Sequence, residues 1–162
     1  MSETYFGHKK VSPKEKTENV DHVFSSVWPV YDKMNDVMSL GVHHLWKRQA
    51  VETLEADIMD HVIDLACGSG DLSSLLISKL PKGHITCIDP NPDMLNLCRN
   101  RLNIHPNVSF EQAYAENLPT HIAPADRLIL SFGLRNFTDP KKALREINRS
   151  LKMGGKLVIV EF

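Results

Sequence analysis

The sequence predicts an α/β fold in which a parallel sheet carries helices on both faces. Three observations support this prediction. Short apolar runs alternate with helical segments from residue 61 onward, the first run ends in a glycine loop, and 162 residues suit one domain. The chain is 42% hydrophobic and 24% charged, which is typical of a globular protein. Its net charge of -1 excludes a general attraction to nucleic acid.

The first sixty residues are predicted to form an arm and a helical lid. Residues 1 to about 18 are polar and without periodicity, so we expect a loose arm. Apolar residues at helical spacing predict short helices over Val20–Val27 and Met34–Leu40, and a third from His43 into the fifties. Residues 61–162 are expected to form the core.

Five apolar runs in this core predict parallel strands, at Val62–Ala66, Ile85–Ile88, Val108–Ala113, Arg127–Phe132 and Leu157–Phe162. A helix over Pro92–Leu102 begins with proline, which suits a first helical position. A second helix, Pro140–Leu151, is expected to end at Gly154 and Gly155.

The glycine loop after the first strand is a candidate ligand site. Gly68 and Gly70 allow a tight turn and the close approach of a ligand. A dinucleotide site would need Gly or Ala where this chain has Ser73, and Asp71 would repel a pyrophosphate, although it could also be a helix N-cap. With Asp64 at the strand end, the carboxylates suit a sulfonium and an ammonium group. The loop therefore favours S-adenosylmethionine over a nicotinamide cofactor.

Residues after the next strands extend this candidate site. Asp89 ends the second strand, where an acid can bind ribose hydroxyls, although an Asp before Pro also forms turns. Tyr114 and Ala115 follow the third strand, where an adenine would lie. Ser131 closes the fourth strand beside the point where the strand order reverses.

Several short motifs occur along the chain. They are Phe6-Gly7, Tyr31 to Asp36 with Met38-Ser39, Trp46 to Arg48, Asp64 to Leu72, and the run S-F-G-L-R-N at Ser131 to Asn136 followed by Thr138-Asp139. In these motifs the chain resembles the ubiquinone/menaquinone biosynthesis C-methyltransferases, from Tyr5 to its last residue. The run S-F-G-L-R-N is much narrower than the glycine loop, which many methyltransferases share.

This resemblance implies a Rossmann-like class I methyltransferase with an N-terminal helical lid. It implies methyl transfer from S-adenosylmethionine to a ring carbon of a polyprenylated benzoquinol or demethylmenaquinol. Carried over by motif, Ser73, Asp89, Tyr114, Ala115 and Ser131 would contact the cofactor, together with Asp64, Gly68 and Gly70.

The chain departs from the family pattern at two positions. The family usually has Asn or Asp where this chain has Tyr114, so stacking on the adenine is expected in place of a hydrogen bond. At His44 the family pattern has Arg, so a fixed charge is replaced by a titratable one.

Five residues are candidates for catalysis. Arg135 and Asn136 could stabilise a quinol oxyanion. Tyr31, Asp32 and His43 could position the ring or relay its proton. The alternatives are that Tyr31 packs within the lid, Asp32 caps a helix and His43 is a structural histidine.

Members of this family are longer and have further strands, so the last strands of the fold are expected to be missing. The fifth strand would then be an apolar sheet edge, which predicts a homo-oligomer formed through it. With no apolar run of about 20 residues and no signal core, the cytoplasm is expected, peripheral to the inner face of the membrane. A path for the polyprenyl tail could involve Val23, Phe24, Val27, Trp28, Met34 and Met38, although these could equally be ordinary packing residues.

Two other functions stay open. The chain could be a truncated, non-catalytic module that binds the cofactor or a partner, or it could be a nicotinamide oxidoreductase. The cysteines, Cys67, Cys87 and Cys98, form no C-x-x-C pair and predict free thiols without disulfides or bound zinc.

Overall fold

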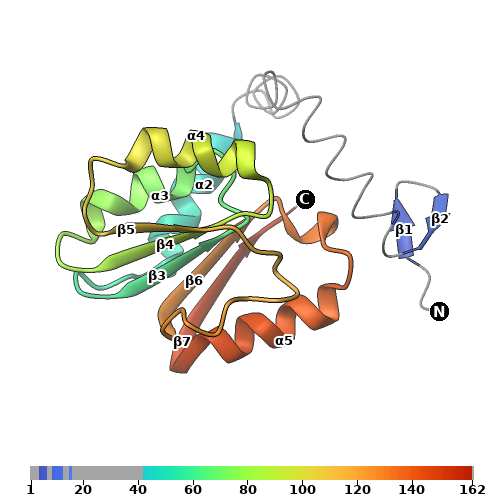
Figure 1. The fold of residues 1–162 in the computed structure, drawn as a ribbon. Helices are drawn as coiled ribbons and strands as arrows, with labels where there is room; N and C mark the ends of the chain where they lie inside the picture. The colour runs from blue at the N-terminus through green and yellow to red at the C-terminus, as the bar shows by residue number, and fades with distance from the viewer. Residues whose placement is uncertain (1–3, 7–8, 13–14, 16–41, 162) are drawn as a thin grey trace.

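The computed structural model describes residues 4–6, 9–12, 15 and 42–161 (Figure 1). The predicted helices over Val20–Val27 and Met34–Leu40 lie outside these residues. Residues 1 to about 18 were expected to form a loose arm. This is wrong for the described part of that segment, where β1 (Thr4–Phe6) pairs antiparallel with β2 (Lys9–Val11). Both segments contain aromatic or β-branched residues, which favour strands, but three residues are too few to show a periodicity.

The core is a parallel sheet. Its strands in the described residues are β3 (His61–Leu65), β4 (His84–Ile88), β5 (Val108–Glu111), β6 (Ala125–Ser131) and β7 (Leu151–Val160). They lie in the order β5-β4-β3-β6-β7, and every neighbouring pair is parallel. The chain builds outward from β3 to β5 and then returns to the other side of β3. This reversal confirms the predicted doubly wound fold and places the carboxyl ends of β3 and β6 side by side.

Helices cover both faces of the sheet (Figure 1). On one face lie α2 (Val42–Leu54), α3 (Asp71–Leu76) and α4 (Pro92–Leu102), and on the other lies α5 (Pro140–Ser150). Two hydrophobic clusters correspond to these faces, because alternate residues of a strand point to opposite sides. Val158 and Val160 belong to the α2 side, whereas Leu157 and Ile159 belong to the α5 side.

The start of α4 is confirmed at Pro92, and its cap explains why. The side chain of Asn91 accepts hydrogen bonds from the backbone of Asp93 and Met94, and Pro92 occupies the first helical position. At α5, Asp139 caps in the same way by accepting from the backbone of Lys142.

The predicted end of the second helix is wrong. Helix α5 ends at Ser150, and β7 begins at once with Leu151 opposite Ala125. The register then shifts, so that Lys156 lies opposite Arg127, and Gly154 adopts a left-handed φ of 77° within this irregularity. The two glycines therefore serve a bulge within β7 and do not cap the helix.

Helix α2 shares the core of the sheet. Ala50, Val51 and Leu54 are buried in one cluster with Val62 and Ile129, so the predicted boundary at residue 60 separates elements that pack together. In the described part of the chain, no helix is both long and apolar enough to span a membrane.

Replacing Leu130 in β6 by Ala should lower the free energy of unfolding by about 2–5 kcal/mol, because the side chain is fully buried and its removal leaves a cavity. The matched control is Leu144→Ala on the exposed side of α5, which should change it by less than about 0.5 kcal/mol. Urea denaturation of both variants measures the difference. Equal losses would contradict the packing described.

Candidate functional site

The carboxyl ends of β3 and β4 are joined by hydrogen bonds through the glycine loop. Gly68 donates its backbone N–H to Asp89 Oδ2 at 2.9 Å, and Cys67 donates to the carbonyl of Ile88 at 3.1 Å. The other oxygen of Asp89 accepts from the backbone of Asn91 at 2.9 Å. Asp89 is thus held at the end of β4, as predicted, and it also fixes the position of the loop.

The two glycines of this loop have different surroundings. A Cβ on Gly70 would lie 2.7 Å from Cys98 Sγ, so Gly70 is required for packing against α4. A Cβ on Gly68 would meet nothing within 4 Å. Gly68, with a left-handed φ of 54°, therefore turns the chain while leaving open space beside the loop.

Backbone strain is found at the carboxyl ends of both central strands. Ala66 after β3 and Phe132 after β6 adopt left-handed φ angles of 54° and 57°. The two turns also approach closely, because a Cβ on Gly133 would lie 2.8 Å from that of Ala66. Non-glycine residues in this conformation are uncommon and gather at ligand-binding and catalytic sites.

Asp64 is fully buried beneath the start of α3. Its Oδ2 accepts hydrogen bonds from the backbone N–H of Ser73 at 3.1 Å and from its hydroxyl at 2.6 Å. Its Oδ1 has no hydrogen-bond partner in the described chain. Burial raises the pKa of Asp64 to about 8, and the hydrogen bonds from Ser73 only partly oppose this rise.

Ser73 is also fully buried, and its hydroxyl lies between Asp64 and Cys87 Sγ, 3.1 Å away. The observed function of Ser73 is therefore to hold Asp64. A direct contact between Ser73 and the cofactor stays a prediction.

Ser131, the last residue of β6, provides a second buried oxygen. Its Oγ has no hydrogen-bond partner among the described residues. Alternation along β3 and β6 places Asp64 and Ser131 on the same face as Val62 and Ile129, the face covered by α2 and α3. Since buried polar atoms are normally hydrogen-bonded, the two oxygens fit a site for a polar ligand.

Asp71 is not a helix N-cap. The cap position of α3 is Gly70, and Asp71 is the first helical residue. Its carboxylate forms ion pairs with Lys47 of α2, at 2.6 Å, and with Arg101 of α4. Burial opposes ionisation, but the hydrogen bond and charge of Lys47, followed by those of Arg101, outweigh it and lower the pKa of Asp71. Asp71 thus connects three helices.

The loop after β5 contains the predicted adenine residues. Tyr114 is 44% exposed and Ala115 is buried. Glu116, in the same loop, has a role that the sequence did not reveal. Its Oε1 accepts hydrogen bonds from the backbone N–H of Thr138 at 2.7 Å and of Asp139 at 3.1 Å. Glu116 therefore ties this loop to the one after β6, a contact over 22 residues that no local signal predicts.

Arg135 and Asn136 lie in a short 3-10 helix, Leu134–Asn136, after β6. The guanidinium of Arg135 lies 3.3 Å from Glu161, which follows β7, and its backbone N–H donates to the same carboxylate at 3.4 Å. The positive charge of Arg135 is therefore held at the carboxyl edge of the sheet by a partner that the sequence did not reveal. Tyr31 and Asp32 lie outside the described residues. His43 lies in α2, but its side chain is not described.

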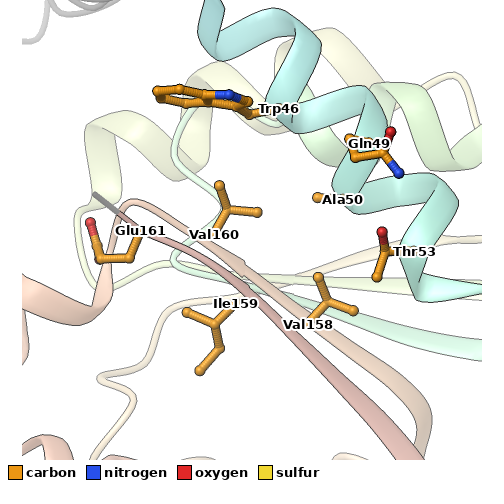
Figure 2. A pocket seen from close by; sticks show the side chains of 8 residues that line it. All are labelled: Trp46, Gln49, Ala50, Thr53, Val158, Ile159, Val160 and Glu161. Atoms are coloured by element: carbon orange, nitrogen blue, oxygen red, sulfur yellow. The ribbon is translucent and has the colours of Figure 1, made fainter.

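A groove of about 400 Å³ lies between α2 and β7 (Figure 2). Val158 and Val160 point from β7 toward α2, and Trp46 and Ala50 face them. The groove is lined by Trp46, Gln49, Ala50, Thr53, Val158, Ile159, Val160 and Glu161. The rings of Trp46 and Phe132 are 6.3 Å apart, so the groove reaches the turn after β6. The residues predicted to line an apolar path, Val23 to Met38, lie outside the described residues.

Comparison with known proteins identifies the family. The profile of the ubiE/COQ5 methyltransferase family matches residues 11–162. The chain belongs to this family. Two curated relatives in the family are named ubiquinone/menaquinone biosynthesis C-methyltransferase UbiE. The protein from Legionella pneumophila is 43% identical and that from Shewanella baltica 45%, each over 163 residues. These matches cover 98% of this chain but only 65% of each relative.

Solved structures confirm the Rossmann-like methyltransferase fold of this ubiE/COQ5 family member. The YcgJ protein of Bacillus subtilis is 25% identical with a TM-score of 0.68, over 74% of this chain and 51% of its own. A Thermotoga maritima protein described as a SAM-dependent methyltransferase, possible histamine N-methyltransferase, is also 25% identical with a TM-score of 0.68, over 86% of this chain and 60% of its own. S-adenosylmethionine is thus the cofactor of this family and fold.

The raised pKa of Asp64 predicts a pH-dependent stability. Between about pH 4 and pH 8 the folded protein keeps a proton that the unfolded chain has lost, so the free energy of unfolding falls as pH rises, by up to about 1.4 kcal/mol per pH unit. Asp64→Asn removes this dependence. Urea denaturation at several pH values should show wild type losing stability relative to the variant from pH 5 to pH 8. A constant difference would contradict the assigned pKa.

Proposed function

We propose that this protein transfers a methyl group from S-adenosylmethionine to a ring carbon of a polyprenylated benzoquinol or demethylmenaquinol. The observation that carries the proposal is that two buried oxygens, Asp64 Oδ1 and Ser131 Oγ, on the neighbouring strands β3 and β6, have no hydrogen-bond partner among the described residues. The open space beside Gly68, in the loop that follows β3, adds to it. Family membership supports the methyl donor and the class of acceptor, and both remain proposals for a chain that spans about 65% of its curated relatives.

The residues present fit the cofactor. S-adenosylmethionine supplies an electrophilic methyl on a sulfonium and carries an ammonium group. Asp64 can accept a hydrogen bond from the ammonium, which favours the ionised carboxylate and offsets the cost of its burial. Ser131 offers a second acceptor, Asp89 lies where it can bind the ribose, and Tyr114 has an exposed ring that can stack on the adenine.

The residues after β6 and β7 suit the acceptor ring. Arg135 pairs with Glu161, and Glu161 lines the groove, so the guanidinium lies at the groove's rim. There it can stabilise the oxyanion that forms when a quinol hydroxyl loses its proton, which raises the electron density of the ring. Asn136, in the same turn, could share this role. Tyr31, Asp32 and His43 stay candidates for positioning the ring and removing its proton.

The groove between α2 and β7 suits an apolar tail. Trp46, Ala50, Val158 and Val160 present mainly carbon to it, and it leads away from the turn that carries Phe132. A polyprenyl chain there would bring the protein to a membrane surface, so the proposal keeps the cytoplasm and the inner face of the membrane as its location. Since β7 ends the described sheet order, pairing of its free edge with a second copy is also proposed.

Methyl transfer from S-adenosylmethionine to a quinol acceptor, followed by mass spectrometry of the methylated product, tests this function. Ser131→Ala should raise the S-adenosylmethionine concentration needed for half-maximal rate by about tenfold, the value of one hydrogen bond of roughly 1.4 kcal/mol, and should leave kcat nearly unchanged. The matched control is Ser78→Ala, at an exposed serine whose hydroxyl donates to the carbonyl of Leu75 at 3.4 Å.

No methyl transfer by a folded protein that still binds the cofactor would favour the alternative function, a non-catalytic cofactor-binding or partner-binding module. Binding of NADH in place of S-adenosylmethionine would instead favour an oxidoreductase.

A further inference from the structure

The three cysteines, scattered in the sequence, meet in the fold. Cys67 lies in the glycine loop, Cys87 in β4 and Cys98 in α4, and their Sγ atoms all lie within 4.8 Å of one another. The sulfurs of Cys67 and Cys98 lie 4.0 Å apart. All three thiols are free and buried. All three belong to the hydrophobic cluster that α2, α3 and α4 form with the sheet, and the proposed methyl transfer does not use them.

We propose that Cys67, Cys87 and Cys98 together bind one copper(I) ion. This inference does not depend on the proposed methyl transfer, because none of the three metal ligands is a residue proposed to contact the cofactor or the acceptor.

The spacing of the sulfurs suits a trigonal site. With metal–sulfur distances of about 2.3 Å, three ligands in a plane around a metal lie about 4.0 Å apart. The sulfurs of Cys67 and Cys98 already have this separation. An upper limit of 4.8 Å for the remaining pairs means that each has to close by less than about 1 Å.

The donor set selects the metal. Three sulfur ligands without a nitrogen are soft, and soft thiolates select copper(I), zinc or iron–sulfur clusters. Structural zinc sites are almost always four-coordinate, and the group found in the described residues has three members. Copper(I) is satisfied by three thiolates.

The surroundings orient the ligands and give access to them. Ser73 Oγ lies 3.1 Å from Cys87 Sγ and is itself fixed by Asp64, so Cys87 has an outer partner of the kind that orients metal ligands. Gly70, which has no Cβ, leaves room for Cys98 Sγ. Cys67 is 8% exposed and precedes Gly68, beside which there is open space, so an ion can enter through the glycine loop.

Binding would connect the glycine loop directly to β4 and α4. Three thiol protons would pass to the buffer as three sulfur–copper bonds form, and copper would remain in the +1 state. A bound ion would therefore restrain the loop that carries Gly68.

The test is an anaerobic titration of the fully reduced protein with copper(I) in competition with bicinchoninic acid, whose colour reports the metal it retains. One equivalent should bind. Each of Cys67→Ser, Cys87→Ser and Cys98→Ser should lower the affinity at least about 100-fold, since even outer partners of a metal site contribute 10–100-fold. Ala143→Ser, which places a hydroxyl at a buried position of α5 on the opposite face of the sheet, is the matched control and should bind as wild type.

X-ray absorption at the copper edge keeps the proposal testable if a cysteine variant fails to fold. It should show three sulfur neighbours at about 2.3 Å in the wild-type protein. Two sulfur neighbours, binding that survives loss of any one cysteine, tighter binding of zinc than of copper(I), or no binding would each overturn the proposal. The cysteines would then be small apolar core residues.

Discussion

The buried carboxyl group of Asp64 is the constraint around which the candidate site is organised. It lies near the end of the central strand, beneath the start of α3, and only one of its two oxygens is hydrogen-bonded in the described chain. A carboxyl group in this position is costly, since burial, followed by the neighbouring Cys87, raises its pKa to about 8 despite the hydrogen bonds from Ser73. The fold tolerates this cost because Ser73 holds the group by two hydrogen bonds. A cationic ligand would remove much of the remaining cost of burying the carboxyl group.

The turns around Asp64 also carry an energetic cost at the candidate site. Ala66 and Phe132 adopt left-handed conformations that stability alone does not favour, and Gly133 brings their two turns into contact. Asp89 holds the glycine loop from one side, and Glu116 connects the loops after β5 and β6. Strained turns held by such long-range hydrogen bonds provide a preformed edge on which a ligand can bind without large rearrangement.

Much of this architecture could be predicted from the sequence, and particular residues show why. Pro92 with Asn91, and Pro140 with Asp139, are local start signals, so both helix starts were predicted correctly. Gly154 and Gly155 resemble a helix end, and only the pairing of Leu151 with Ala125 shows that they belong to a strand. The antiparallel pair of Thr4–Phe6 and Lys9–Val11 has strands too short to recognise from sequence.

The sequence predicts which strand ends form the site, because the carboxyl ends of parallel strands meet where the strand order reverses. What each side chain does there depends on contacts between distant segments. The ion pair between Arg135 and Glu161, the unpartnered oxygen of Asp64 and the meeting of three separate cysteines are of this kind. No local pattern contains them.

The most direct measurement is a calorimetric titration of the purified protein with S-adenosylhomocysteine at pH 7, in buffers of different ionisation enthalpy. The account predicts saturable one-to-one binding with release of up to one proton, because a carboxyl group with a pKa of about 8 is mostly protonated at that pH and ionises when it meets the ligand's ammonium group. Asp64→Asn should bind more weakly and release no proton. Absence of binding by a folded sample, or binding unchanged in Asp64→Asn, would contradict it.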